Sequence, residues 1–396
     1  MNHIKPACLI VTVILAFGTA CSKSGVAIED AGKAKGKIFT VDNSGDAGQF
    51  VSIDIDVNDK VHMVYYDKKN KALKYVRQSA AGFAAATVDD TCINCLYATI
   101  KVTGKGEPHL AYYSDATQTF TYAYKKGSEW KKEPIEWGKG TGMGARLLFD
   151  EKFQLHALYY SGDGFLKHGW RILRKDAPKV PEPKKTKKTK KTGTKTAVEE
   201  ETEGLWGNER VDKANGSEKV QISFVRNPQG GLATSYFHWS GMSSELRVAI
   251  QQQDGSWSSQ IVAKEDNPGK SSELFFTNSK EPRIIFREAM KNRLSIAKAS
   301  VEGWQSSPFL EDVYNMALDA DAGGDLLIAY EKLSGRDPRK GNLCYVLRKA
   351  GKWTRYEVDP AKGSGTHLDA IFTSSSGPVI AYYEETGHSL KLFIAD

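Results

Sequence analysis

A short apolar segment with a central aromatic residue recurs seven times along the chain, and this repeat constrains the fold more than any other feature. The first copy is VHMVYYD at 61–67 and the last is VIAYYEE at 379–385. The aligned aromatic residues are 44 to 52 positions apart, except for one interval of 77 that contains a low-complexity insert. A period of 40 to 50 residues with several short strands is typical of a propeller. We therefore predict an all-β chain that folds as a seven-bladed β-propeller. The aligned residues are Tyr65, Tyr112, Tyr159, Tyr236, Phe286, Tyr330 and Tyr382.

Each repeat divides into four strands separated by turn residues. In the first repeat we expect strands at 50–57, 61–67, 72–78 and 83–89. The last repeat has only three strands before the chain ends at Asp396. Residues 36–42, GKIFTVD, resemble the fourth strand of the sixth repeat, so we expect this N-terminal strand to complete the last blade and close the ring. Glycine and tryptophan mark the hairpin before the fourth strand in five repeats, where we expect the indoles to cover blade edges.

The N-terminus has the features of an export signal. Residues 1–20 contain Lys5, an apolar run at 7–17 that is too short to span a bilayer, and small residues after it. Ala20 followed by Cys21 resembles a bacterial lipoprotein signal, although Gly18 stands where that family usually has leucine. The resemblance implies that Cys21 carries lipid such as palmitate, with 21–35 as a flexible tether. A membrane-anchored location in the cell envelope, with the outer membrane first, is expected; an ordinary cleaved secretory signal is the alternative.

The remaining cysteines indicate a disulfide. Cys92 and Cys95 form Cys-x-x-Cys, and in an exported chain a local disulfide is the expected state. No second pair completes a zinc centre, and a redox-active pair would need a strand and helix context that is absent from the sequence pattern. Cys344 lies in an apolar segment and is expected to be buried. We predict no metal and no cofactor.

A lysine-rich insert at 174–204 interrupts the third repeat between its third and fourth strands. Its composition is too polar for a packed core, so we expect it to be disordered. Clustered lysines are attracted to anionic membrane surfaces, and contact with a membrane or another polyanion is the first hypothesis. A solubilising loop without a partner is the alternative, and binding of nucleic acid does not fit an exported protein. The lysines are Lys184, Lys185, Lys187, Lys188, Lys190, Lys191 and Lys195.

One face of the predicted ring presents the turns between second and third strands and the turns between blades. Loops on a rigid scaffold commonly carry binding sites. Trp239 and His238 are candidates to stack on a sugar or fill a partner's pocket, with ordinary exposed surface as the alternative. Three histidines, His62, His109 and His156, begin the second strand of three different repeats, which separates them around the ring and makes them structural. The candidates for polar recognition on the loop face are Arg287, Glu288, Glu331 and Arg336.

The hairpin DGSW at 254–257 resembles the Asp-box of the BNR or sialidase-like propellers, without its leading serine. That resemblance implies an arginine triad, for which Arg146, Arg283 and Arg287 are scattered candidates. No carboxylate pair in the sequence suggests glycoside hydrolysis. We therefore expect a monomeric, non-catalytic binding or scaffold module that contacts an envelope protein or glycan. The alternative is a sialidase-like or other glycan-active enzyme, or a carbohydrate-binding lectin. Fold alone does not decide between them.

Overall fold

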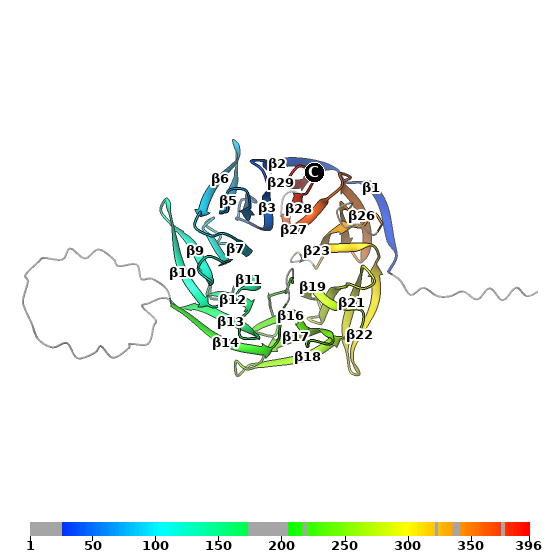
Figure 1. Ribbon diagram of the computed structural model, residues 1–396. Coiled ribbons are helices and arrows are strands. Elements are labelled where there is room, and N and C mark those ends of the chain that lie inside the picture. Colours follow the sequence, from blue (N-terminus) through cyan, green and yellow to red (C-terminus); the bar gives the residue numbers. More distant parts are fainter. Residues whose placement is uncertain (1–25, 173–204, 217–219, 321–323, 336–340, 374–376) are drawn as a thin grey trace, which may run out of the picture.

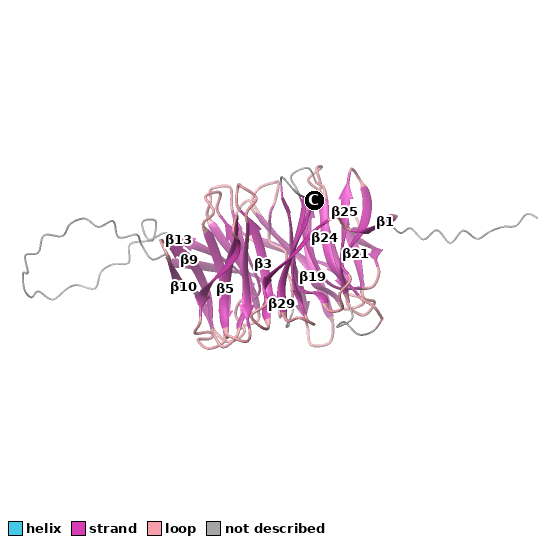
Figure 2. Cartoon of the chain, turned by 90° about the horizontal axis from the view of Figure 1, so that it is seen from above, coloured by secondary structure: helices cyan, strands magenta, loops and turns pink. Residues whose placement is uncertain are grey.

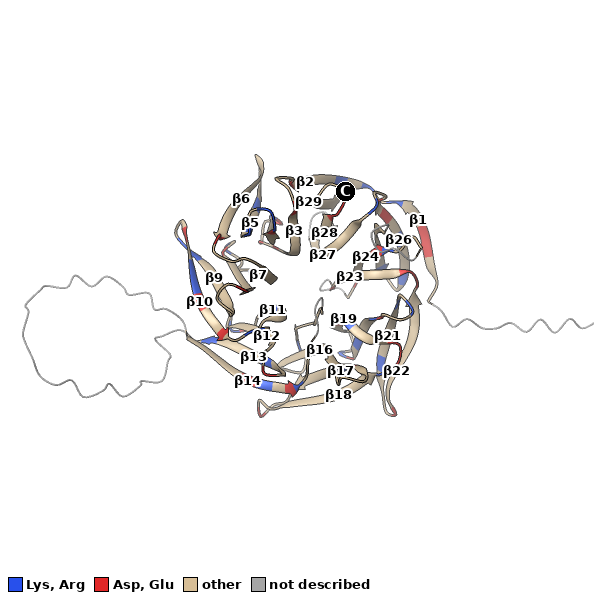
Figure 3. Ribbon diagram, viewed as in Figure 1, with Lys and Arg blue, Asp and Glu red and all other residues tan. Residues whose placement is uncertain are grey.

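The computed structural model describes residues 26–172, 205–216, 220–320, 324–335, 341–373 and 377–396. The regular secondary structure of these residues consists entirely of β-strands. Seven sheets of four principal strands surround a central axis, which confirms the predicted seven-bladed propeller (Figure 1). The four strands of a blade are named A to D from the inside of the ring outward. Figure 2 shows the ring from the side, with the turns gathered at its two opposite faces. Acidic and basic residues are spread around the whole ring (Figure 3).

The strands of the first four blades follow the chain without interruption apart from the insert. Blade 1 contains β3 (Ala47–Ile55), β4 (Val61–Asp67), β5 (Ala72–Ser79) and β6 (Gly82–Asp89). Blade 2 contains β7 (Cys95–Val102), β8 (Pro108–Ser114), β9 (Thr119–Lys126) and β10 (Glu129–Trp137). Blade 3 contains β11 (Met143–Phe149), β12 (Leu155–Tyr160), β13 (Phe165–Ile172) and β14 (Leu205–Lys213). Blade 4 contains β15 (Val225–Arg226), β16 (Leu232–Trp239), β17 (Ser244–Gln251) and β18 (Trp257–Ala263).

The last three blades include the two N-terminal strands. Blade 5 contains β19 (Pro268–Phe276), β20 (Pro282–Glu288), β21 (Arg293–Ser300) and β22 (Gly303–Leu310). Blade 6 contains β23 (Val313–Ala320), β24 (Leu326–Lys332), β25 (Asn342–Lys349) and β26 (Lys352–Asp359), with β1 (Ile28–Lys33) added outside β26. Blade 7 contains β27 (Ser364–Thr373), β28 (Gly377–Glu384), β29 (Ser389–Ala395) and β2 (Gly36–Asp42).

The hydrophobic core lies in layers between neighbouring blades. In one such layer, Tyr66 and Leu73 of blade 1 pack with Leu110 and Tyr112 of blade 2. Both faces of a blade are therefore covered, which explains why a B strand such as β4 is buried along its whole length and is apolar without strict alternation. All seven aligned aromatic residues of the B strands are at most 1% exposed.

A hydrogen bond between blades recurs at most of these aromatic positions. In five blades the buried tyrosine donates its hydroxyl to an acidic residue at or near the end of the preceding blade's D strand. In four of the five, the Lys or Arg opposite that tyrosine on strand C forms an ion pair with the same acid. The repeat therefore specifies a polar connection between blades as well as an apolar core. The pairs are Tyr65 with Asp42, Tyr112 with Asp89, Tyr159 with Glu136, Tyr236 with Asp212 and Tyr382 with Asp359.

The hairpin tryptophans also connect blades, as the sequence pattern predicts. Each one lies at the start of a D strand and contacts the outer part of the preceding blade. Four pack against aromatic rings, and Trp304 donates its indole N–H to Gln260 at 3.3 Å. These indoles therefore belong to the scaffold. The ring pairs are Trp130 with Tyr75 at 5.3 Å, Trp206 with Tyr122 at 5.5 Å, Trp257 with His168 at 5.7 Å and Trp353 with Phe309 at 4.5 Å between centroids.

The N-terminal strands close the ring. The predicted closing strand is confirmed as β2, which pairs antiparallel with β29 from Gly36 opposite Ala395 to Asp42 opposite Leu390. The flexible tether predicted at 21–35 is wrong for 28–33, because these residues form β1, paired parallel with β26. Ile28 packs against the apolar layer beside blade 6, which gives this polar strand one anchor. In Figure 1, β1 and β2 follow one another along the outer rim of blades 6 and 7.

The A strand of blade 4 differs from the prediction, and two other predicted segments lie outside the described residues. The predicted A strand of blade 4 is reduced to β15, because Gln221 forms a parallel bridge with Ser271 of blade 5 instead of a ladder within its own blade. The insert joins strands C and D of blade 3 as expected, but its lysines lie outside the described residues. Cys21 and the signal segment lie outside them too. In the described part of the chain, no helix has the length and hydropathy needed to cross a membrane.

Candidate ligand site at the mouth of the central channel

A cavity of about 300 Å³ opens at one end of the central channel, where the A strands begin. Its lining includes one residue from the same position in each of the seven blades, fifteen residues before the aligned B-strand aromatic. We call this set the mouth ring. Turns between blades and between strands B and C lie on this side, so the cavity occupies the face that the sequence analysis selected for binding. The mouth ring consists of Phe50, Tyr97, Gly144, Gln221, Ser271, Asn315 and His367.

Local backbone distortion accompanies the mouth ring. The pairing of strands A and B shifts register next to the ring residue in several blades, including blades 1, 2, 3 and 7. Phe50, Tyr97 and His367 have φ values of 53°, 56° and 46°, in the left-handed region that non-glycine residues seldom occupy. Each such residue costs about 1 to 3 kcal/mol, and strain of this kind is commonly found at functional sites. The bulges place these three large side chains at the cavity.

The mouth ring has two chemically different walls. Blades 7, 1 and 2 supply a continuous aromatic wall, in which Phe50 lies 4.8 Å from His367 and 5.6 Å from Tyr97 between ring centroids. Blades 4, 5 and 6 supply Gln221, Ser271 and Asn315, whose amides and hydroxyl can donate and accept hydrogen bonds. The Asn315 amide donates to Glu331 at 2.7 Å, which fixes its orientation. Blade 3 contributes Gly144, which has no side chain, so at this ring position the wall consists of backbone.

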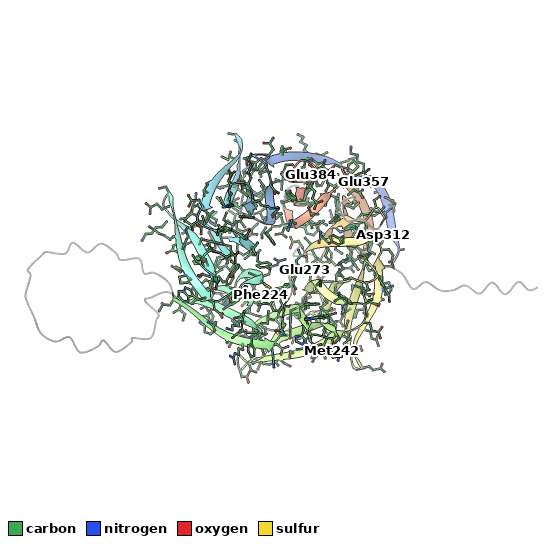
Figure 4. All side chains as sticks on the ribbon, in the orientation of Figure 1. Phe224, Met242, Glu273, Asp312, Glu357 and Glu384 are labelled. Carbon is green, nitrogen blue, oxygen red and sulfur yellow. A yellow bond between two sulfur atoms is a disulfide. The ribbon has the colours of Figure 1, made fainter. Side chains whose placement is uncertain are left out.

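Charged groups lie along the channel next to the mouth ring. Arg146, two residues after Gly144, lines the cavity and lies 3.7 Å from the carboxylate of Glu273 on blade 5. Glu273 projects into the centre of the ring in Figure 4, and burial raises the pKa of its carboxyl to about 8 against the opposing effect of Arg146. Two aspartates nearby are structural, because Asp369 accepts the Ile53 N–H at 2.9 Å and thereby connects blade 7 to blade 1, while Asp319 connects blade 6 to blade 7 in the same way.

The two candidate stacking residues lie on the mouth face. Trp239 ends β16 and is 42% exposed. His238 is half-buried and its Nδ1 accepts the Asn215 N–H at 3.3 Å. Neither side chain lines the cavity, so they lie on the loop face outside it.

Three of the four polar candidates are structural, and the prediction that they form an exposed recognition surface is wrong. Arg287 is 8% exposed and donates to the Val313 carbonyl at 3.1 Å and to Asn292 at 2.7 Å. Glu288 is 6% exposed and pairs with Arg293, while Glu331 is fully buried. These residues end B strands, where the side chain points between blades instead of into solvent. Arg336 lies outside the described residues.

The histidines and cysteines predicted to be structural have internal partners. His62 and His109 each place Nδ1 within hydrogen-bond distance of a tyrosine, and His156 pairs with His168. Cys92 and Cys95 form a disulfide with their Cα atoms 5.6 Å apart. Cys344 is buried with a free thiol. Across the described ranges, no group of three or more His, Cys, Asp or Glu residues is placed to hold a metal ion.

The sequence pattern indicated Arg146 only as a scattered arginine and did not indicate the mouth ring. The ring could have been found by reading position by position through the seven aligned repeats, because its members share one offset from the B-strand aromatic. Their chemical types differ from blade to blade, so neither hydropathy nor residue identity singles out the position.

Comparisons with known proteins agree on the fold. No family model and no curated protein matches the chain. Among solved structures, an ulvan lyase of polysaccharide lyase family PL25, bound to -[GlcA(1-4)Rha3S]-, matches with a TM-score of 0.54 and 8% identity over 93% of this chain and 94% of that one. A protein of unknown function from Dyadobacter fermentans matches with a TM-score of 0.51 and 9% identity over 91% and 98%. At such identities these similarities show a shared fold alone.

Proposed function

We propose that this chain is an exported, lipid-anchored propeller that binds a glycan at the mouth of its central channel. The observation that carries the proposal is the mouth ring, in which an aromatic wall faces a wall of amides and a hydroxyl across a cavity of about 300 Å³. A sugar ring has apolar C–H faces that stack on aromatic side chains, and hydroxyls around its edge that pair with amides. The cavity volume is at the lower end of the range for ligand pockets, so the cavity can hold one small part of a larger ligand.

The architecture favours one asymmetric site over seven equivalent ones. The mouth ring residues differ in every blade, so the cavity is asymmetric and favours one orientation of its ligand. The match to a polysaccharide lyase propeller supports a glycan as the ligand class, because a related architecture accommodates a saccharide in that protein. The strained backbone of Phe50, Tyr97 and His367 also supports a role beyond packing.

The test is a glycan array on residues 26–396, followed by titration of any glycan that binds. Tyr97→Ala and Gln221→Ala remove one group from each wall, and each should weaken binding at least tenfold, equivalent to about 1.4 kcal/mol. Phe153→Ala is a matched control, since Phe153 is 79% exposed in the turn between β11 and β12, on the face opposite the cavity. Undiminished binding by both wall variants, or silence across the array, would reject a glycan site at the mouth ring.

The membrane anchor forms a separate part of the proposal. Cys21→Ala should release the full-length protein from membranes into the aqueous phase on detergent partitioning. Continued partitioning with detergent would show that Cys21 is not the lipidated residue. Deletion of residues 184–196 should leave folding intact and reduce salt-sensitive association with vesicles that contain anionic lipid, because roughly 1 kcal/mol per lysine is lost near such a surface. Association that does not change would assign the lysine tract no role at the membrane.

A second candidate function is cleavage of the bound glycan, and one observation favours it. Glu273 lies beside Arg146, and because burial raises the pKa of Glu273 to about 8, much of this carboxyl is protonated at neutral pH and able to donate a proton. Mass spectrometry of each bound glycan separates the two functions. Products that disappear in Glu273→Gln, while binding persists, would establish an enzyme; intact glycan with the wild-type chain would leave binding alone.

A further inference from the structure

Two tryptophans on the mouth face have exposed indole rings. Trp137 is the last residue of β10 and is 69% exposed, and Trp239 is the last residue of β16 and is 42% exposed. Five of the other six tryptophans cover blade edges, and Trp170 packs beside His168 with 5.5 Å between ring centroids. Large indole surfaces left in water are common at binding sites and costly elsewhere.

The backbone contacts of these two residues place them on either side of blade 3. The turn between strands B and C of that blade is 161–164. On one side, the segment that follows Trp137 packs on this turn, where the Gly162 N–H donates to the Thr141 hydroxyl at 3.3 Å. On the other side, Ala214 donates its N–H to the Gly164 carbonyl at 3.1 Å. The carbonyl of the next residue, Asn215, accepts the backbone N–H of Trp239 at 3.0 Å. The turn 161–164 therefore lies between the backbone segments that contact or follow the two tryptophans.

Blade 3 is also where the mouth ring lacks a side chain. Gly144 has a φ of 63°, and a Cβ atom there would come within 3.1 Å of Val220 Cγ1 and 3.3 Å of the Val220 carbonyl oxygen, so the position is built for glycine. Blade 3 thus contributes backbone instead of a side chain to the mouth ring, and the two exposed indoles flank that blade.

We infer that the ligand is a chain of several sugar residues, part of which occupies the cavity while the rest crosses blade 3 between Trp137 and Trp239. The indoles then act as outer stacking subsites, and the mouth ring binds the inner residue. This inference rests on the proposed glycan site and deepens it, because it selects oligosaccharides and polysaccharides over single sugars or short termini.

The experiment compares chito-, cello- and glucuronate–rhamnose oligosaccharides, each as a disaccharide and a hexasaccharide, by calorimetric titration. The hexasaccharide of the recognised series should bind at least tenfold more tightly than its disaccharide. Trp137→Ala and Trp239→Ala should each remove about tenfold of the hexasaccharide affinity and leave the disaccharide affinity unchanged. Phe153→Ala, on the opposite face, should change neither.

Each other outcome has a distinct meaning. Equal affinity for the two lengths would overturn the outer subsites while leaving the mouth ring site in place. Equal losses for both lengths in the tryptophan variants would show that the indoles support the cavity and do not contact an extended ligand. Failure of every disaccharide and hexasaccharide to bind would reject the proposed glycan function, and the inference with it.

Discussion

The hydrogen bond between Tyr65 and Asp42 offers a sharp test of how the blades are held together. It joins blade 1 to the closing strand β2, with the Tyr65 hydroxyl 2.7 Å from the Asp42 carboxylate. Tyr65 is fully buried and the Asp42 side chain is 9% exposed. Hydrogen bonds to charged groups contribute about 1.5 to 3 kcal/mol. Asp42 retains the Ser44 N–H at 2.9 Å and an ion pair with Lys74, so we expect Tyr65→Phe to cost about 2 kcal/mol.

The chain itself supplies a control for this substitution. Tyr330 occupies the equivalent position in blade 6 and is as deeply buried, but the preceding D strand ends in Leu310 and offers no acid. Tyr330→Phe should therefore cost well under about 1 kcal/mol, as the natural Phe286 in blade 5 suggests. Urea unfolding followed by tryptophan fluorescence measures both variants. Equal shifts of the unfolding midpoint would refute the role assigned to the acidic partner.

Two other predictions concern pH and closure. Burial lowers the pKa of His109 to about 4, so the unfolded chain takes up a proton at this imidazole at a higher pH than the folded chain does. The free energy of unfolding should therefore fall by up to about 3 kcal/mol as pH drops from 6.5 toward 4. In His109→Gln this pH dependence, measured as urea midpoints at pH 7.5 and 5, should be flatter, and an unchanged slope would contradict the assignment. Deletion of 26–33 removes β1 but not β2, so it should lower the free energy of unfolding by only about 1 kcal/mol. Deletion of 26–42 also removes β2 and should abolish cooperative thermal unfolding. Equal effects of the two deletions would show that closure of the ring does not depend on β2.

The strands were predictable because each blade repeats the same pattern with both faces buried. The spacing of the B-strand aromatics and the resemblance of 36–42 to a D strand were enough to locate the closing strand. In contrast, β1 is polar and holds to β26 through its backbone and Ile28, so its side chains carry little signal. The A strands begin earlier than expected, as β3 does at Ala47, because a bulge near the ring residue extends the ladder toward the cavity.

The candidate site was only partly predictable for a related reason. Exposed residues in turns, such as Trp239, could be assigned to the correct face from strand order alone. Charged residues at the ends of B strands, such as Glu331, could not be distinguished from surface residues, since the alternation of the strand does not show that the next blade covers them. The acidic partners were recognisable in principle, because four of the five precede their tyrosine by 23 residues.

The contacts that hold the blades together and the residues of the proposed binding site occupy different positions of one repeat. The aromatic residue of strand B recurs in every blade and its acidic partner in most, because each blade must hold its neighbour. The mouth ring, fifteen residues earlier, differs in every blade and includes left-handed backbone at Phe50, Tyr97 and His367. Glycine would relieve the backbone strain at each of these three positions. Phe50 also packs on the layer between blades 1 and 2, and all three rings line the cavity on a strained backbone, which supports the proposed role in binding. Substitutions there should impair binding more than they impair folding.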